Sequence, residues 1–257
     1  MKKTAYDVIL YLVAFAAIQI IVSFGTLLGK PFGLQPDDPI MLVAISATAS
    51  IITLLLFLWR KWTPVGKTYI QSKPWATLIW SGVAAIGVVI PSVWLQEQMP
   101  ALPDTAGDTL QKIISTPGGY FVIALLAPVV EEVVFRGAIL RALLSSMQSK
   151  WGAICISAAL FALIHFNPAQ TPHAFLMGWL MGWLYMRTGS IVPGVVFHWA
   201  NNTVAYLMTV AYPGDETKLV DIFGGNENAV WMSVVFSMCI FIPALFQLNI
   251  WTKKRGR

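Results

Sequence analysis

Charged residues are scarce in this chain. Asp, Glu, Lys and Arg make up 11% of its 257 residues, and 57% are apolar, whereas a soluble domain carries about 25% charged residues. The mean hydropathy is +0.68. This composition excludes an ordinary soluble enzyme and predicts a protein embedded in a lipid bilayer. The net charge of +5 is small, so we expect no nucleic-acid partner.

Long apolar runs take the place of the missing charges. They are wide enough for helices of about 20 residues, the length that crosses a bilayer core, and short breaks bearing Pro and Gly separate them. We see no internal repeat. We predict an all-α, polytopic membrane protein that forms one integral domain over residues 1–257, with about eight transmembrane helices. The expected spans are 5–28, 39–59, 75–96, 118–144, 151–167, 171–187, 191–212 and 229–251.

Basic residues are distributed unevenly among the predicted loops. With a cytoplasmic N-terminus, 13 of the 17 Lys and Arg residues fall on the cytoplasmic side, and nine of the 12 acids fall outside. The Lys and Arg bias sets membrane orientation. We therefore predict that both termini are cytoplasmic and that the number of spans is even. The twin-lysine start and the short loops favour a bacterial plasma membrane.

Cysteine and histidine are also rare. Cys155 and Cys239 lie in apolar segments, where we expect buried thiols. His165 and His198 fall inside predicted spans, whereas His173 stands at the start of one and is expected at the interface. The H-E-x-x-H pattern of zinc proteases is absent.

One predicted span carries three ionisable groups, in the stretch VEEVVFR. A charge at the centre of a bilayer costs at least about 2.5 kcal/mol, so these groups need a reason. Glu132 and Arg136 stand four residues apart and can pair on one helix face. Glu131 has no obvious partner in its own helix. A packing network between helices would also explain the three groups, and the Glu132–Arg136 pair fits that explanation best.

The intramembrane polar groups fall at similar depths. At 1.5 Å per helical residue, Glu131 and His165 both lie about 20 Å from the cytoplasmic ends of their spans, and Asn202 lies about 16 Å deep. His198 comes out at about 10 Å, four residues before Asn202 and on the same face. Helices that run in opposite directions would thus bring these groups to similar depths near the middle of the membrane.

Two kinds of chemistry fit this set. A carboxylate shielded from water is a competent general base, a histidine beside it can hold a water, and His198 with Asn202 offers donors to a developing oxyanion. Glutamate and histidine are equally normal ligands of zinc. Hydrolysis of an amide, with or without a metal, is therefore expected.

Three motifs occur in order, each in a predicted span: E-E-x-x-x-R (Glu131, Glu132, Arg136), F-x-x-x-H (Phe161, His165) and H-x-x-x-N (His198, Asn202). Together they resemble the CPBP family, the type II CAAX prenyl endopeptidase and bacteriocin-processing family, over residues 118–212.

The resemblance implies an intramembrane endopeptidase. Glu131 would activate water beside His165, and His198 and Asn202 would stabilise the oxyanion. Glu132, Arg136 and Phe161 would support the site. The family is often labelled as metalloproteases, so Glu131, His165 and His198 are also the candidate zinc ligands.

The expected substrate is a membrane-associated protein or peptide, cleaved at membrane depth or just inside the cytoplasmic face. Bacterial peptide processing and bacteriocin immunity are the expected settings. Gly178 and Gly182 form a G-x-x-x-G pair that favours close packing on a neighbouring helix, or a homo-oligomer. An ion- or proton-coupled transporter is an alternative function, because such pathways also use Glu, His and Arg. A non-catalytic immunity or scaffold protein on the same fold is a further alternative.

Overall fold

The computed structural model describes residues 2–27, 35, 37–213 and 217–253, and every regular element within these ranges is a helix. The predicted all-α fold is therefore confirmed for this part of the chain. Lys30 and the tail residues Lys254, Arg255 and Arg257, which contributed to the predicted topology, lie outside the described residues.

Eight long helical segments lie at the predicted positions. They are α1 (Lys2–Ser23), α2 (Pro39–Trp59), α4 (Trp75–Glu97), a continuous helix over residues 119–146, α8 (Lys150–Leu163), α9 (Thr171–Thr188), α10 (Val192–Ala211) and α12 (Glu227–Lys253). Short helices α3 (Thr68–Gln71), α5 (Gly107–Ile114) and α11 (Leu219–Ile222) lie in the connections. Two boundaries differ most from the prediction: α1 ends at Ser23 and not at residue 28, and α8 ends at Leu163 and not at residue 167.

The helix over residues 119–146, called the motif helix below, is not a regular α-helix. It contains two π-helical stretches, η2 (Phe121–Leu126) and η3 (Glu132–Leu140), with α6 (Ala127–Glu131) between them and α7 (Arg141–Ser146) at the end. Glu131 is the last residue of α6, and Glu132 and Arg136 belong to η3. π-Helical turns are rare and occur frequently at functional sites.

Local sequence explains several helix ends. The Asp38 carboxylate accepts hydrogen bonds from the amides of Ile40 and Met41 at the start of α2, and the Ser149 hydroxyl accepts one from Gly152 at the start of α8. Such side chains satisfy amides that have no partner inside the helix. Gly189 ends α9 in the left-handed conformation, with φ of 66°, which glycine adopts without steric cost.

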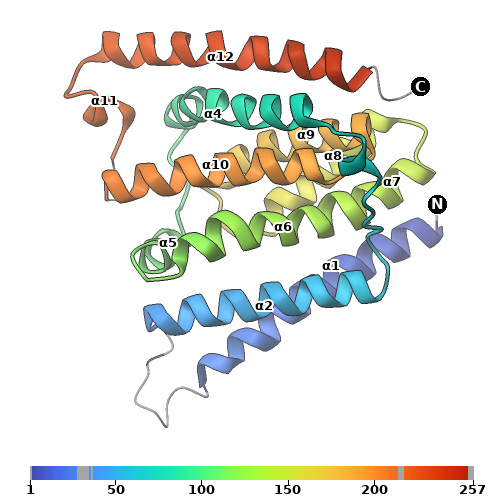
Figure 1. Ribbon diagram of the computed structural model, residues 1–257. Helices are drawn as coiled ribbons and strands as arrows, with labels where there is room; N and C mark the ends of the chain where they lie inside the picture. Colours follow the sequence, from blue (N-terminus) through green and yellow to red (C-terminus); the bar gives the residue numbers. More distant parts are fainter. Residues whose placement is uncertain (1, 28–34, 36, 214–216, 254–257) are drawn as a thin grey trace.

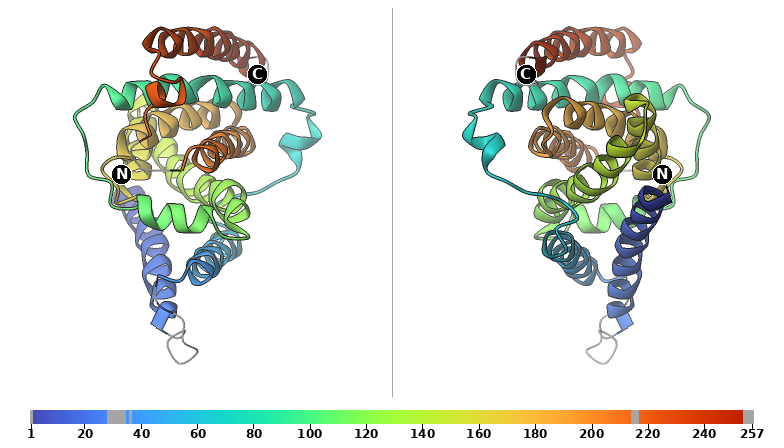
Figure 2. Two further views of the ribbon diagram at one scale, coloured as in Figure 1. Left: turned by 90° about the vertical axis from the view of Figure 1, so that its left-hand side faces the viewer. Right: turned by 90° about the vertical axis from the view of Figure 1, so that its right-hand side faces the viewer.

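The motif helix occupies the middle of the molecule. In Figure 1, α1 and α2 lie on one side of it, and α10, α4 and α12 follow in succession on the other. The end-on views in Figure 2 place α12 at one outer edge and the α1–α2 pair at the other. The helices α8 and α9 pack on each other and on η3. This central position brings five neighbouring helices within reach of the motif residues.

The G-x-x-x-G pair joins α9 to α8 inside the molecule. A Cβ atom on Gly178 would stand 3.0 Å from the Phe161 ring and 3.3 Å from Ala158 Cα, and one on Gly182 would stand 3.0 Å from Ile154. The predicted close packing on a neighbouring helix is therefore confirmed. The homo-oligomer stays a prediction.

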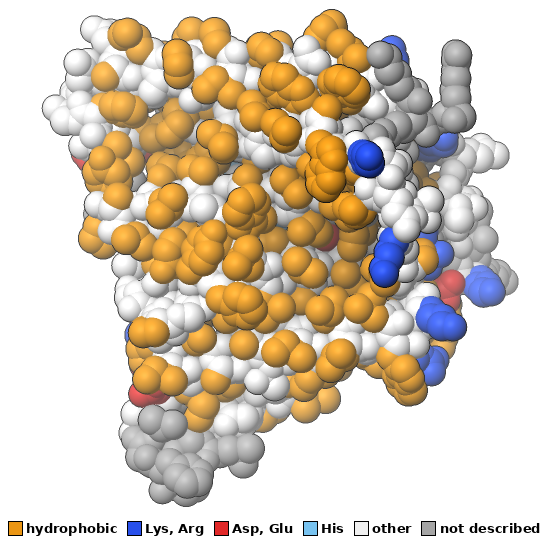
Figure 3. All heavy atoms as spheres, viewed as in Figure 1, with side chains coloured by type: hydrophobic (Ala, Val, Ile, Leu, Met, Phe, Trp, Pro, Cys, Tyr) orange, Lys and Arg blue, Asp and Glu red, His pale blue; other side chains and the backbone are white. Residues whose placement is uncertain are grey.

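Four helices are long and apolar enough to cross a membrane by length and composition: α1 together with the turn that follows it, α2, α4 and α12. The motif helix, α9 and α10 are not among these candidates, and α8 is apolar but shorter. In Figure 3, hydrophobic side chains cover most of the visible face. The structure thus supports a membrane protein with four candidate spans, and the count of eight stays a prediction.

The two ends of the helix bundle differ in charge. The beginning of α1 and the end of α12 lie at the same end of the molecule (Figure 1), and the visible Lys and Arg side chains gather there (Figure 3). The orientation, with both termini in the cytoplasm, stays a prediction. Cys155 and Cys239 differ from expectation, because both are exposed on the described surface and not buried.

Candidate active site

Glu132 and Arg136 form the predicted ion pair. Arg136 Nη1 lies 2.6 Å from Glu132 Oε1, and both side chains are buried, with 1% and 0% of their surface exposed. Arg136 Nη2 donates a second hydrogen bond to the Gly178 carbonyl, at 3.1 Å. Its guanidinium also lies over the Phe161 ring, 4.4 Å from the centroid. The burial of both charges is therefore offset by several contacts at once.

This pair faces His198, and Glu131 lies on the other side of the His198 ring. His198 Nδ1 lies 3.6 Å from Glu132 Oε1, and His198 Nε2 lies 3.6 Å from Glu131 Oε2. Both separations exceed hydrogen-bond length, so these groups are close neighbours and not bonded partners. The pair therefore does not contact Glu131 directly. Instead it borders the imidazole that stands between the two glutamates.

Gly194, one turn before His198 on α10, makes room for this arrangement. A Cβ atom at Gly194 would overlap Glu132 Oε2. The approach of α10 to the motif helix therefore depends on a residue without a side chain.

His165 reaches the site from a turn and not from a helix. It follows the end of α8 by two residues, and its Nδ1 lies 2.7 Å from the Phe161 carbonyl oxygen. A carbonyl can only accept, so Nδ1 carries the proton and Nε2 of the neutral ring is an acceptor. The Phe161 ring packs edge-on against both histidines, with centroids 4.9 Å from His165 and 5.7 Å from His198. Phe161 thus fixes the two rings relative to each other.

The four predicted catalytic residues meet at one cavity. Glu131, His165, His198 and Asn202 all line a space of about 240 Å³ between the motif helix, α9 and α10. A second cavity, of about 280 Å³, opens toward α1 and α2 and is also lined by Glu131 and His165. These two residues can therefore be reached from both cavities. A group that acts on substrate or water has to be accessible in this way.

Asn202 is held by the motif helix. Its Nδ2 donates to the Ile123 carbonyl in η2, at 3.1 Å. Pro128, five residues after Ile123, has no N–H with which to close a π-helical turn. The amide of Asn202 supplies a donor at this point and retains a second N–H.

Other carbonyls of the π-helical stretches accept side chains in the same way. Thr63 donates to the Val133 carbonyl at 2.6 Å, and Ser157 of α8 donates to the Phe135 carbonyl at 3.1 Å. Inside a membrane each backbone polar group needs a protein partner. These bonds fasten the motif helix to the loop after α2, to α8 and to α10.

Two cavity residues were not predicted. Asn201 is buried, 6% exposed, and His173 was expected only at the interface. Both line the cavity that Glu131 and His165 line, and Asn201 Nδ2 lies 3.5 Å from His173 Nε2. The available signal was the doubled asparagine in HWANN, where only the second asparagine has the spacing of the motif.

The predicted zinc ligands do not form a ready metal site. Among the described residues, no three His, Cys, Asp or Glu side chains converge closely enough to hold an ion. The present arrangement therefore does not fit a metal, and we derive no step through one.

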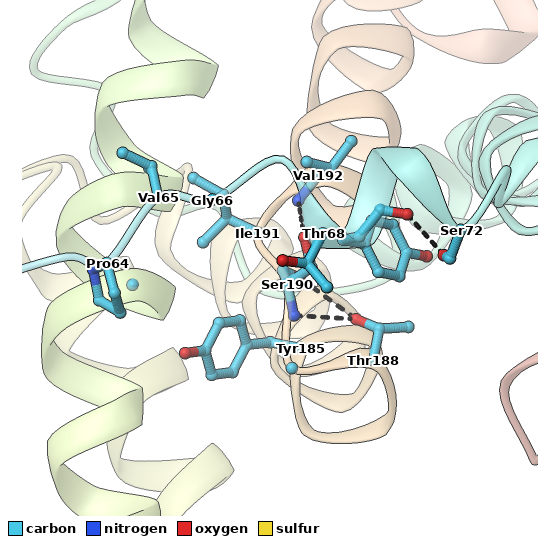
Figure 4. A pocket seen from close by; sticks show the side chains of 13 residues that line it. Pro64, Val65, Gly66, Thr68, Ser72, Tyr185, Thr188, Ser190, Ile191 and Val192 are labelled. Carbon is cyan, nitrogen blue, oxygen red and sulfur yellow. Dashed lines mark hydrogen bonds between the residues drawn. The ribbon is translucent and has the colours of Figure 1, made fainter. Parts of the chain in front are cut away.

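A larger cavity lies away from these residues. It has a volume of about 510 Å³ and is lined by the segment around α3, by Gly137 and by the α9–α10 turn. Figure 4 shows its hydroxyl groups bonded locally: the Ser190 amide donates to Thr188, at 3.3 Å, and the Val192 amide donates to Ser190, at 3.2 Å. None of the four predicted catalytic residues lines it.

Comparison with known families confirms the predicted resemblance. Residues 114–204 match the model of the family described as type II CAAX prenyl endopeptidase Rce1-like. The matched segment contains all three motifs, and it supports an endopeptidase at the level of the family. Neither the curated proteins nor the solved structures gave a match.

Proposed function

We propose that this protein is an intramembrane endopeptidase that hydrolyses a peptide bond with a water activated by Glu131. The observation that carries the proposal is the position of Glu131. Its carboxylate lies 3.6 Å from His198 Nε2, in a cavity that His165 and Asn202 also line. A base, two imidazoles and an amide donor around one small cavity are the parts that amide hydrolysis needs.

The proposed reaction assigns one task to each group. Glu131 takes one proton from water, and His165 Nε2 accepts a hydrogen bond from the other O–H of that water. The resulting hydroxide attacks the substrate carbonyl, and the C–N bond breaks after a tetrahedral intermediate forms. His198 Nε2 and the remaining N–H of Asn202 donate to the oxyanion. Glu131 then returns its proton to the leaving amine.

Glu132, Arg136 and Phe161 hold the reacting groups in position. Glu132 stands beside His198 Nδ1, Arg136 neutralises Glu132, and Phe161 packs on both imidazoles. The three residues thus act through His198 and His165 and not on the substrate.

The proposal includes a location and a substrate. We propose a bacterial plasma-membrane protein with eight spans and both termini in the cytoplasm. Its substrate is a membrane-associated protein or peptide, in peptide processing or bacteriocin immunity. The charge distribution of the loops and the four candidate spans support the membrane setting, and the family match supports the reaction.

Cleavage of membrane-anchored peptides by the purified protein tests the proposal. We expect Glu131→Gln and His165→Ala to lower the turnover rate at least about 100-fold, the usual share of a general base, while the protein stays folded. Glu227→Gln, the same change at the exposed start of α12, is the control. An assay with a chelator shows whether the water needs a metal.

Two outcomes would overturn this function. Proton-coupled flux in proteoliposomes that depends on Glu131 would favour the transporter. A biological activity that survives Glu131→Gln would favour the non-catalytic immunity or scaffold protein.

A further inference from the structure

His173 and Asn201 line the cavity but have no task in the proposed hydrolysis. His173 lies in the first turn of α9 and Asn201 in the middle of α10. Their side chains approach each other, with 3.5 Å between His173 Nε2 and Asn201 Nδ2. Asn201 Oδ1 is buried and has no hydrogen-bond partner in the protein. A buried acceptor without a partner is costly, which indicates that something else bonds to it.

A chain of hydrogen bonds fixes which atom each group presents. The Ile123 carbonyl can only accept, so Nδ2 of Asn202 faces it. Asn202 Oδ1 then accepts from Asn201 Nδ2, at 3.3 Å. Because Nδ2 of Asn201 also faces His173 Nε2, that nitrogen is the acceptor and the neutral ring carries its proton on Nδ1. The pair therefore offers one acceptor, Asn201 Oδ1, and one donor, His173 Nδ1–H.

A peptide main chain has the complementary pattern, a donor N–H beside an acceptor C=O. Main-chain hydrogen bonds of this kind are a recurrent way to bind extended peptides independently of their side chains. We propose that His173 and Asn201 bind the main chain of the substrate next to the scissile bond and so position it against Glu131. The proposal rests on the proposed function, because it names a further part of the same site.

Peptides that lack one main-chain N–H test this directly. A membrane-anchored substrate is N-methylated at one amide at a time on both sides of the cleaved bond, and binding is measured with the Glu131→Gln protein. We expect one amide at which N-methylation raises Kd at least about tenfold, the effect of losing one ordinary hydrogen bond. If no single amide stands out, the proposal is wrong.

The variant Asn201→Leu, added to Glu131→Gln, completes the test. We expect it to weaken binding of the unmodified peptide about as much as that N-methyl group does, and to make binding insensitive to the N-methyl group. Thr203→Val is the control, since Thr203 lies on the same helix and does not line the cavity. A double variant that stays as sensitive to N-methylation as its parent would overturn the proposal.

The binding assay separates this inference from the proposed function. If the wild-type protein cleaves no peptide but the Asn201-dependent binding is found, the peptide site stands and the hydrolase fails. If Glu131 is needed for cleavage and Asn201→Leu changes neither KM nor the binding pattern, the hydrolase stands and the peptide site fails.

Discussion

At the scale of single residues, one line of side chains accounts for the buried charges. Arg136 pairs with Glu132, Glu132 borders His198, and His198 borders Glu131. Glu132 and Arg136 therefore provide a fixed, neutral pair behind the imidazole. The side chains of Arg136 and Glu132 are 1% and 0% exposed, whereas that of Glu131 is 22% exposed, so the last carboxylate is the one that the cavity reaches.

Removing one member of the Glu132–Arg136 pair should lower the stability of the protein more than removing both. Arg136→Leu leaves Glu132 buried without a partner, which costs about 3–5 kcal/mol. Replacing Glu132 by Leu as well should recover most of that stability, because apolar residues often substitute for a buried ion pair at little cost. Unfolding in detergent measures both variants, with the exposed Lys150→Leu as control.

The same experiment can contradict the role assigned to the pair. A double variant no more stable than Arg136→Leu would show that the pair has contacts that apolar side chains cannot replace. Cleavage should stay low in the double variant even if stability returns, because His198 would then lack its neighbouring carboxylate.

At the scale of elements, the long apolar runs predicted where the helices lie but not how their backbones are wound. Runs of apolar residues predicted the positions of all eight long segments, because a run inside a membrane must satisfy its backbone hydrogen bonds within a helix. The π-helical turns of η2 and η3 were missed, because they depend on bonds such as Asn202 to Ile123 that join distant parts of the chain. The motifs predicted that Glu131, His165 and His198 belong to the candidate site. His173 and Asn201 line the same cavity but belong to no motif.

The contact between α4 and α12 depends on Gly87. A Cβ atom there would lie 2.8 Å from the backbone nitrogen of Phe241, and a backbone atom cannot move aside without the helix. Gly87→Ala should therefore lower the free energy of unfolding by about 1–3 kcal/mol. Gly82 lies on the same helix, and a Cβ there meets only Val196, at 3.8 Å. Gly82→Ala should be neutral or slightly stabilising. Equal effects of the two changes on thermal unfolding would contradict this packing.

At the scale of the whole molecule, the predicted orientation places α3 and α5 on opposite sides of the membrane. Single cysteines at Lys67 and Asp108, both exposed positions, test it in a chain with Cys155→Ser and Cys239→Ser. A maleimide that does not cross membranes should label Asp108→Cys in intact cells, and Lys67→Cys only after the cells are opened. The reverse pattern, or labelling of both sites in intact cells, would overturn the orientation.

The side chains that bind the carbonyls of the motif helix also limit how the molecule can move. Thr63, Ser157 and Asn202 attach this helix to three different neighbours, and Arg136 attaches it to a fourth, α9. Alternating access requires one group of helices to rock against another around the binding site. Here such rocking would break several buried hydrogen bonds simultaneously, with no water to replace them. The motif helix is therefore suited to a stationary site that substrates approach and leave.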